Sequence, residues 1–238
     1  MRGILTIAGR DLAAAFGRPQ AYVVLGVFIA LLSLLTLGLD DVLRSGVASM
    51  RGPFYWMSAC LLFLVPATTM GSLAEERGSG RLELLESLPW RTSALVIGKW
   101  LAAVAMVVAA LALTAPWPLL LVYYGSLDPG PVAGGYLGLL LGGASLAAVG
   151  TAASALADRQ VSAFVLALEA GLVPWLLGFA LPLLPADWVA WVGWLTFEHH
   201  FENLARGVLD TRSLVFFGSV TALFLRVATH LLERRRLR

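Results

Sequence analysis

The sequence predicts an all-α integral membrane protein with six transmembrane helices. Of its residues, 59% are hydrophobic and only 13% are charged, whereas soluble domains contain about 25% charged residues. The apolar residues come in blocks of about 20, the length that a helix needs to cross about 30 Å of hydrocarbon. The blocks do not alternate apolar and polar residues as the strands of a barrel do, and lipid requires backbone polar groups to be satisfied within the segment.

Six apolar blocks qualify as spans and take up most of the 238 residues. We therefore expect one transmembrane domain, residues 1–238, with no separate soluble domain. The first block is longer than the apolar region of a signal peptide, about 7–15 residues, so we expect it to be retained. Prolines in the third and fifth blocks predict kinks or short breaks there. The six blocks are 21–39, 54–73, 94–122, 132–156, 161–184 and 213–232.

Lysine and arginine residues set the expected orientation. With the N-terminus in the cytoplasm, most of the 17 basic residues lie on the cytoplasmic side, and only Arg44, Arg51, Arg206 and Arg212 lie outside. The positive-inside rule therefore predicts that both termini are cytoplasmic. The C-terminal arginines are expected to hold that end inside and to attract anionic headgroups, and so short a tail does not predict nucleic-acid binding.

Residues 1–18 have the pattern of an amphipathic helix that lies in the membrane interface. Apolar residues such as Ile4, Ala8 and Leu12 recur every four positions, while Arg2 and Arg10 fall elsewhere. This arrangement favours an interfacial helix. The alternative is an ordinary segment before the first span, anchored by its arginines.

Charge is concentrated in the segment "EERGSGRLELLESLPWR", residues 75–91, which the orientation places in the cytoplasm. Ser79 is a candidate helix cap and Pro89 a stop signal. Between them Leu84, Leu85 and Leu88 form an apolar stripe, and the charged side chains point away from it. A plain connection between helices needs only about 2–8 residues, so the segment predicts a docking helix, although a simple connector is the alternative.

Besides Lys99 near the start of the third span, two charged residues lie inside the predicted spans. Glu169 falls about a third of the way along the fifth span, and a carboxylate in lipid is costly. We expect it to face the bundle or a wet cavity and to find a partner there, in either a pathway role or a structural one. Arg226 lies near the cytoplasmic end of the sixth span, where snorkelling is the expected behaviour.

The segment "TFEHHFENLARGVLDTR", residues 196–212, is too polar to cross the membrane and predicts helical segments that dip into the outer face of the bundle. Its two histidines, His199 and His200, flanked by acidic residues, suggest a metal site. However, adjacent histidines point to different helix faces, and no H-E-x-x-H motif occurs. We expect no catalytic, cofactor-binding or metal-binding residue in this chain, and a membrane-embedded enzyme is a third, weaker possibility.

A phosphate-binding loop of the form G-x-x-x-x-G-K-[ST] is missing from the sequence. Lys99 is the only lysine, but Trp100 follows it and Ser93 occupies the place of the first glycine. Such a loop holds phosphates through the lysine and Mg²⁺ through the hydroxyl. If ATP drives this protein, the ATPase must be another polypeptide.

Two stretches resemble a known family. The sequence "MGSLAEERGSGRLELLESLPWRTSALVIGKW" resembles the cytoplasmic loop of ABC-2 type permeases, the membrane subunits of ATP-driven exporters. The sequence "HFENLARGVLDTRSLVFF" is similar to the outer loop and last span of the gliding-motility-type branch. The resemblance extends over the whole chain, but it is specific only in these two stretches.

The resemblance implies a permease subunit in a bacterial or archaeal cytoplasmic membrane. Residues 78–89 would be a coupling helix that docks into a separate ATP-binding subunit, present in two copies, which holds ATP and Mg²⁺. The permease would pair with a second copy or with a related permease. The ATPase-coupling residues implied are Glu75, Glu76, Arg77, Arg81, Glu83, Leu84, Leu85, Glu86 and Leu88, and those of an outer gate are Phe197, His200, Phe201, Glu202 and Arg206.

One alternative function stays open at this point. A membrane assembly or scaffold protein would also use a charged cytoplasmic loop to recruit a soluble partner. The sequence does not identify a transported substrate.

Overall fold

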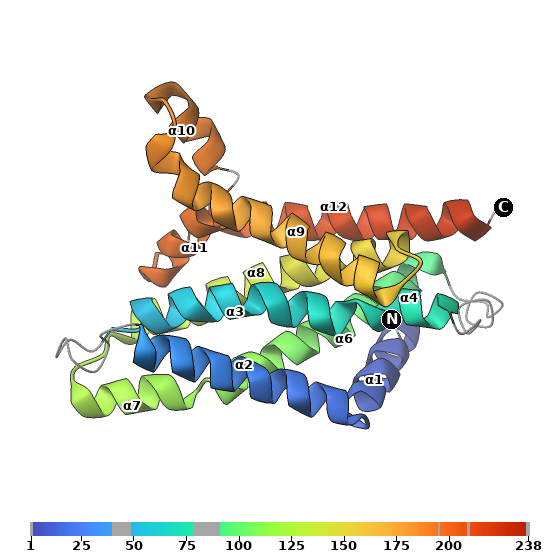
Figure 1. Ribbon diagram of the computed structural model, residues 1–238, viewed down its shortest axis with the longest axis horizontal. Coiled ribbons are helices and arrows are strands. Elements are labelled where there is room, and N and C mark those ends of the chain that lie inside the picture. The colour runs from blue at the N-terminus through green and yellow to red at the C-terminus, as the bar shows by residue number, and fades with distance from the viewer. Residues whose placement is uncertain (1, 40–48, 79–90, 195, 209, 237–238) are drawn as a thin grey trace.

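A computed structural model describes the chain except for residues 1, 40–48, 79–90, 195, 209 and 237–238. The described residues form helices and no strand, and the long helices run side by side in one bundle (Figure 1). The predicted all-α fold is therefore confirmed. The described part of the chain contains α1 (Arg2–Phe16), α2 (Pro19–Gly38), α3 (Arg51–Thr69), α4 (Gly71–Gly78), α6 (Thr92–Leu113), α7 (Pro116–Tyr124), α8 (Pro129–Leu156), α9 (Gln160–Ala180), a 3-10 turn η1 (Leu181–Leu183), α10 (Ala186–Gly193), α11 (Phe197–Ala205) and α12 (Thr211–Arg236).

In the described part of the chain, six helical segments are long and apolar enough to cross a membrane, as predicted. Two of them differ in outline from the expected spans. The second continues from α3 through α4 to Gly78, past the predicted end at residue 73. The third, expected as one helix over 94–122, consists of α6 and α7.

The break between α6 and α7 has a local cause in the sequence. Pro116 and Pro118 lack the backbone N–H that would continue the hydrogen-bond ladder of α6. The Thr114 hydroxyl instead donates to the carbonyl of Leu111 at 2.7 Å and lies 3.0 Å from the Tyr136 hydroxyl of α8. In the fifth span Pro174 lies inside α9 without ending it, and the helix tightens into η1 at Pro182.

Helix α8 is the centre of the bundle, because α3, α4, α6, α9, α11 and α12 all contact it. Its glycines allow these neighbours to approach closely. A Cβ atom added to Gly142 would lie 2.3 Å from the Phe197 ring, and one added to Gly150 would lie 2.1 Å from Thr69 Oγ1. Small residues at helix contacts are the usual means of close packing in membranes.

Helix α1 packs across one end of the bundle (Figure 1) and contacts α6 and α2. Its Ile7 is buried against Gly98 of α6, where an added Cβ would approach the Ile7 side chain to 2.8 Å. The helix predicted for the N-terminus is therefore present and docked. Its location in the membrane interface stays a prediction.

Helices α9 and α12 lie along one edge of the bundle, and α2 and α7 lie along the opposite edge (Figure 1). Within the chain, α9 and α12 are poorly covered: 6% and 11% of their spanning residues are buried, against 56% for α8. The molecule thus has a central helix that is packed on most sides and an edge that is largely open.

Candidate functional site

The helix that leads toward the charged loop is α4. It begins directly after Met70, where α3 ends, and backbone N–H groups at a helix start need acceptors. Ser154 of α8 provides one: its hydroxyl oxygen accepts from the N–H groups of Leu73 and Ala74 at 3.0 and 3.1 Å, and the hydroxyl donates to the Met70 carbonyl at 3.0 Å. One serine therefore fixes both the end of α3 and the start of α4 on the central helix.

The structure divides the predicted coupling residues into two groups. Glu75, Glu76 and Arg77 lie in the second half of α4, in a helix rather than in a loop. The others lie outside the described residues: Arg81, Glu83, Leu84, Leu85, Glu86 and Leu88. The first group can therefore be placed in the bundle, while the role of the whole set stays a prediction.

Arg77 binds the C-terminal end of α8. Its guanidinium donates to the carbonyls of Ala157 at 2.6 Å and Ala155 at 2.8 Å, and it lies 3.4 Å from the Asp158 carboxylate. The last carbonyls of a helix lack partners within the helix and attract cations. Arg235 of α12 binds the same end, donating to the Leu156 carbonyl at 2.8 Å. Two arginines thus hold α4 and α12 to the end of α8.

Lys99 is the centre of an ion-paired cluster that joins α1, α4 and α6. Its ammonium nitrogen Nζ lies 2.7 Å from Glu76 Oε2 and 3.1 Å from Asp11 Oδ2. The Lys99 side chain is only 2% exposed, so these carboxylates take the place of the water that would otherwise surround its amine. Arg10 extends the cluster, at 2.8 Å from Asp11 and 3.5 Å from Glu76. We call Arg10, Asp11, Glu76 and Lys99 the Lys99 cluster.

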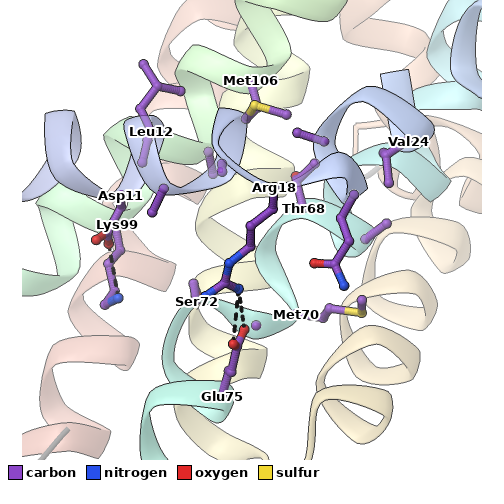
Figure 2. A pocket seen from close by; sticks show the side chains of 18 of the residues that line it. Asp11, Leu12, Arg18, Val24, Thr68, Met70, Ser72, Glu75, Lys99 and Met106 are labelled. Carbon is purple, nitrogen blue, oxygen red and sulfur yellow. Dashed lines mark hydrogen bonds and ion pairs between the residues drawn. The ribbon is translucent and has the colours of Figure 1, made fainter. Parts of the chain in front are cut away.

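A second link joins α4 to the N-terminal region. Arg18, in the turn between α1 and α2, lies 3.1 Å from Glu75, and Figure 2 shows its side chain extending to that carboxylate. About half of the Arg18 side chain is exposed, so this pair is weaker than the buried one. Glu75 of α4 therefore binds the turn between α1 and α2, and the next residue, Glu76, lies beside Arg10 of α1.

A cavity of about 630 Å³ lies between these elements. Arg10, Arg18, Glu75 and Lys99 line its polar part, and small apolar residues of α2, α3 and α6 line the rest (Figure 2). Because of this cavity, the contact of α1 with α4 depends on side-chain ion pairs rather than on close backbone packing. Such a contact is able to rearrange when α4 moves.

Only weak signals in the sequence point to the Lys99 cluster. Lys99 is the single lysine of the chain and follows the apolar start of a span, which marks it as unusual. Nothing in the sequence pairs it with Asp11, which is 88 positions away. Ser154 had no signal at all, since serine is common in membrane helices.

At the other end of the bundle, α11 packs onto the glycines of α8. Phe197 and Phe201 stack with their ring centroids 5.6 Å apart, and Phe201 contacts Gly138. Leu204 is fully buried. Glu202 and Arg206, four residues apart, form an ion pair on the exposed side of α11. Two residues of the predicted outer gate, Phe197 and Phe201, are thus brought together with α8, and the gate function stays a prediction.

His200, another residue of the predicted outer gate, anchors α11 to its surroundings. It is 2% exposed, its Nε2 lies 3.0 Å from the Trp194 carbonyl oxygen, and its ring stacks on Phe216 of α12 at 4.0 Å. Burial lowers the pKa of His200, because the charged imidazolium loses its hydration. Nearby, burial and the carboxylate of Glu202 raise the pKa of Glu198. Among the described residues no three His, Cys, Asp or Glu side chains gather as metal ligands.

Glu169 does not lie where the sequence led us to expect. It is exposed on the outer side of α9 instead of facing the bundle, and within the described part of the chain it has no hydrogen-bond or ion-pair partner. Within the subunit Glu169 does not face the bundle, and its pathway or structural role stays a prediction. The reason is geometric, since Ala163 and Ala167 occupy the inner side of α9 and leave residue 169 on the opposite side.

Comparison with known families identifies the chain. A family model described as "ABC-2 family transporter protein" matches residues 44–197, from before α3 through the start of α11. A search of curated proteins found no match. The matched region covers well over half of the sequence and includes α4, α8 and α9. The six membrane helices and this match together show that the chain belongs to the ABC-2 family of transporter proteins.

Proposed function

We propose that this chain is the permease subunit of an ATP-driven exporter, working as a dimer and driven by two copies of a separate ATP-binding subunit. The family match makes it a multi-pass membrane permease of an ABC transporter. The exporter direction, the dimer and the ATP-binding partner are our proposal. ATP and Mg²⁺ would be bound by the partner subunit, because the sequence has no phosphate-binding loop of its own.

One observation carries the proposal: the helix that enters residues 79–90 is tied to several parts of the bundle at once. Glu76 pairs with Lys99 of α6, Glu75 binds Arg18, and Arg77 binds the end of α8. A partner that moves residues 79–90 would therefore pull on α1, α6 and α8 together. This is the kind of two-state element that a nucleotide-dependent partner biases.

The basic residues support the orientation in which this end is cytoplasmic. The Lys99 cluster, Arg77 and Arg235 would then lie on the side of the ATP-binding subunit, in a bacterial or archaeal cytoplasmic membrane. At the opposite end, α11 and its aromatic contacts with α8 would form the outer gate. The similarity of residues 200–217 to the gliding-motility-type branch supports that placement, and the branch itself stays a prediction.

The partner is tested by purifying the tagged chain from its native membranes in mild detergent and identifying bound proteins by mass spectrometry. We expect an ATP-binding subunit with a phosphate-binding loop. The double variant Glu83→Arg plus Glu86→Arg should lose that subunit, and transport with it, because it reverses two charges of the predicted docking helix. The matched control Glu233→Arg, an exposed reversal near the end of α12, should keep it.

Two outcomes would contradict the proposal. If the double variant keeps both the bound ATPase and transport, residues 83 and 86 do not take part in coupling. If the chain instead copurifies with a cytoplasmic protein that lacks a phosphate-binding loop, the scaffold alternative is favoured.

A further inference from the structure

Two charged residues lie on the uncovered sides of the outer helices. Glu169 of α9 and Arg226 of α12 are both exposed, and within the described chain neither has an ion-pair or hydrogen-bond partner. Both belong to segments long and apolar enough to cross the membrane. Charged residues in such segments almost always face a protein interior or a water-filled space and pair with one another.

Glu169 does not reach water easily along its own helix. Glu169 is nine residues beyond the start of α9 at Gln160, which corresponds to roughly 14 Å of helix. The short glutamate side chain has no long apolar stem with which to snorkel. Lipid alone is therefore a poor environment for this carboxylate.

The two residues lie at a similar depth. Arg235 of α12 contacts Asp158, just before the start of α9, and this contact fixes a common level for the two helices. Arg226 is nine residues before Arg235, again roughly 14 Å of helix. Opposite charges thus occur at matching heights above the same end of the bundle.

The two helices also share one edge of the molecule (Figure 1). Both contact α8 and together leave their outer sides uncovered. The uncovered side of α12 is unusually polar for a lipid-facing surface, since Ser219 and His230 are exposed there in addition to Arg226. We call the exposed sides of α9 and α12 the α9/α12 face.

We infer that the α9/α12 face is covered by a second copy of this chain, and that Glu169 of each copy pairs with Arg226 of the other. A twofold axis along the membrane normal keeps every residue at its own depth, so such pairs require matching heights, which the residue counts along α9 and α12 give. The same axis makes two equivalent pairs, because in a twofold interface residue i contacts j and j contacts i. This inference rests on the proposed dimeric permease and names the surface through which it forms.

Charge reversal in separate copies tests the pairing. One tagged chain carries Glu169→Arg and a differently tagged chain carries Arg226→Glu. Each variant expressed alone places like charges across the interface, so recovery of one tag with the other should fall about tenfold or more relative to wild type. Expressed together, the two variants should recover, because their mixed dimer contains one reversed pair and one natural pair.

Coexpression of the two variants distinguishes pairing between two chains from pairing within one chain. An intrachain pair would be broken in both variants and would recover only when both substitutions are in the same chain. That result, or full dimerisation of each variant alone, would overturn the inference.

Cysteine cross-linking gives a second measurement that does not require charge reversal to be tolerated. In a Cys60→Ala background, chains carrying Glu169→Cys and Arg226→Cys are coexpressed with different tags and oxidised with copper phenanthroline in native membranes. We expect a disulfide-linked pair containing both tags. Val27→Cys, on the exposed side of α2 at the opposite edge, is the matched control and should not form a linked dimer.

Linkage through Val27→Cys without linkage between positions 169 and 226 would overturn the inference. The cross-linking result does not depend on the ATP-binding subunit. Linked chains without a bound ATPase would contradict the proposed function alone, and a bound ATPase without this linkage would contradict the interface alone.

Discussion

The charged residue near the start of α6 and those on α9 and α12 differ in whether their own chain provides ion-pair partners. Lys99, close to the start of α6, is almost fully buried and has two carboxylates within 3.1 Å, both from its own chain. Glu169 and Arg226 also lie in membrane-crossing segments, but the described chain provides no partner for either. The difference indicates which charges hold the subunit together and which are available to another molecule.

The largest expected effect is the loss of subunit stability when the buried Lys99 cluster is broken. Lys99→Met leaves Asp11 and Glu76 close together without a cation, and removing one member of a buried ion pair costs about 3–5 kcal/mol. Because both carboxylates are partly exposed, we expect about 2–4 kcal/mol less stability against unfolding, and looser docking of α1. Thermal unfolding in detergent and protease cleavage after α1 measure these two effects. An unchanged melting temperature would mean that the Lys99 cluster does not hold α1.

The next effect concerns Glu169 and Arg226, whose substitution should weaken dimer assembly without changing the stability of the single subunit. Arg226→Met and Glu169→Gln should change the stability of the single subunit by no more than about 0.5 kcal/mol, as exposed substitutions usually do. Each should nevertheless weaken dimer recovery. Thermal unfolding and two-tag recovery are measured on the same preparations. A large loss of subunit stability would show that these charges have a partner within the chain.

A smaller effect is expected at the outer end, where a histidine rather than an ion pair anchors the helix. The pKa of His200 is lowered in the folded protein, so between that value and the ordinary one of about 6.5 the unfolded state binds more protons. Stability is therefore present above about pH 6.5 and falls as the pH decreases through that range, by at most about 1.4 kcal/mol for each pH unit. Melting temperatures between pH 8 and pH 5 measure this.

Two variants give the control for that measurement. His200→Gln should flatten this part of the pH profile, while His199→Gln, at an exposed position, should leave it in place. If both variants keep the profile of the wild type, the pH dependence arises at another group.

The smallest effect is expected for Arg18→Ala. Its pair with Glu75 is about half exposed on the arginine side, and exposed pairs contribute about 0–1 kcal/mol. Arg206→Ala removes a comparably exposed pair at the other end and is the matched control. Calorimetric unfolding should place both near wild type and well above Lys99→Met. A loss for Arg18→Ala as large as that for Lys99→Met would show that burial does not rank these pairs.

Much of the fold was predictable because its signals are local. The six spans follow from apolar blocks, and the break before α7 follows from Pro116 and Pro118, which act on their own helix. The N-terminal helix follows from its periodicity. Each of these features depends on residues within a few turns of one another.

The parts that were missed depend on distant residues. The second span continues as α4 past its predicted end at residue 73, and this continuation is supported by Ser154, about 80 positions later in the sequence. The partners of Lys99 come from two other helices. The outward direction of Glu169 could not be predicted, because the composition of a span does not state which of its sides meets the bundle. The sequence shows that a charge in a membrane span is energetically unfavourable, but it does not show which molecule provides its partner.

The burial of Lys99 also determines which chemical reagents the protein can react with. It is the only lysine, and its amine is enclosed by Asp11 and Glu76. Amine-directed labels and cross-linkers should therefore leave every side chain of the folded subunit unmodified. The single thiol, Cys60, is buried as well. An engineered surface cysteine would thus be a uniquely addressable handle, which makes the subunit well suited to site-specific spectroscopic probes.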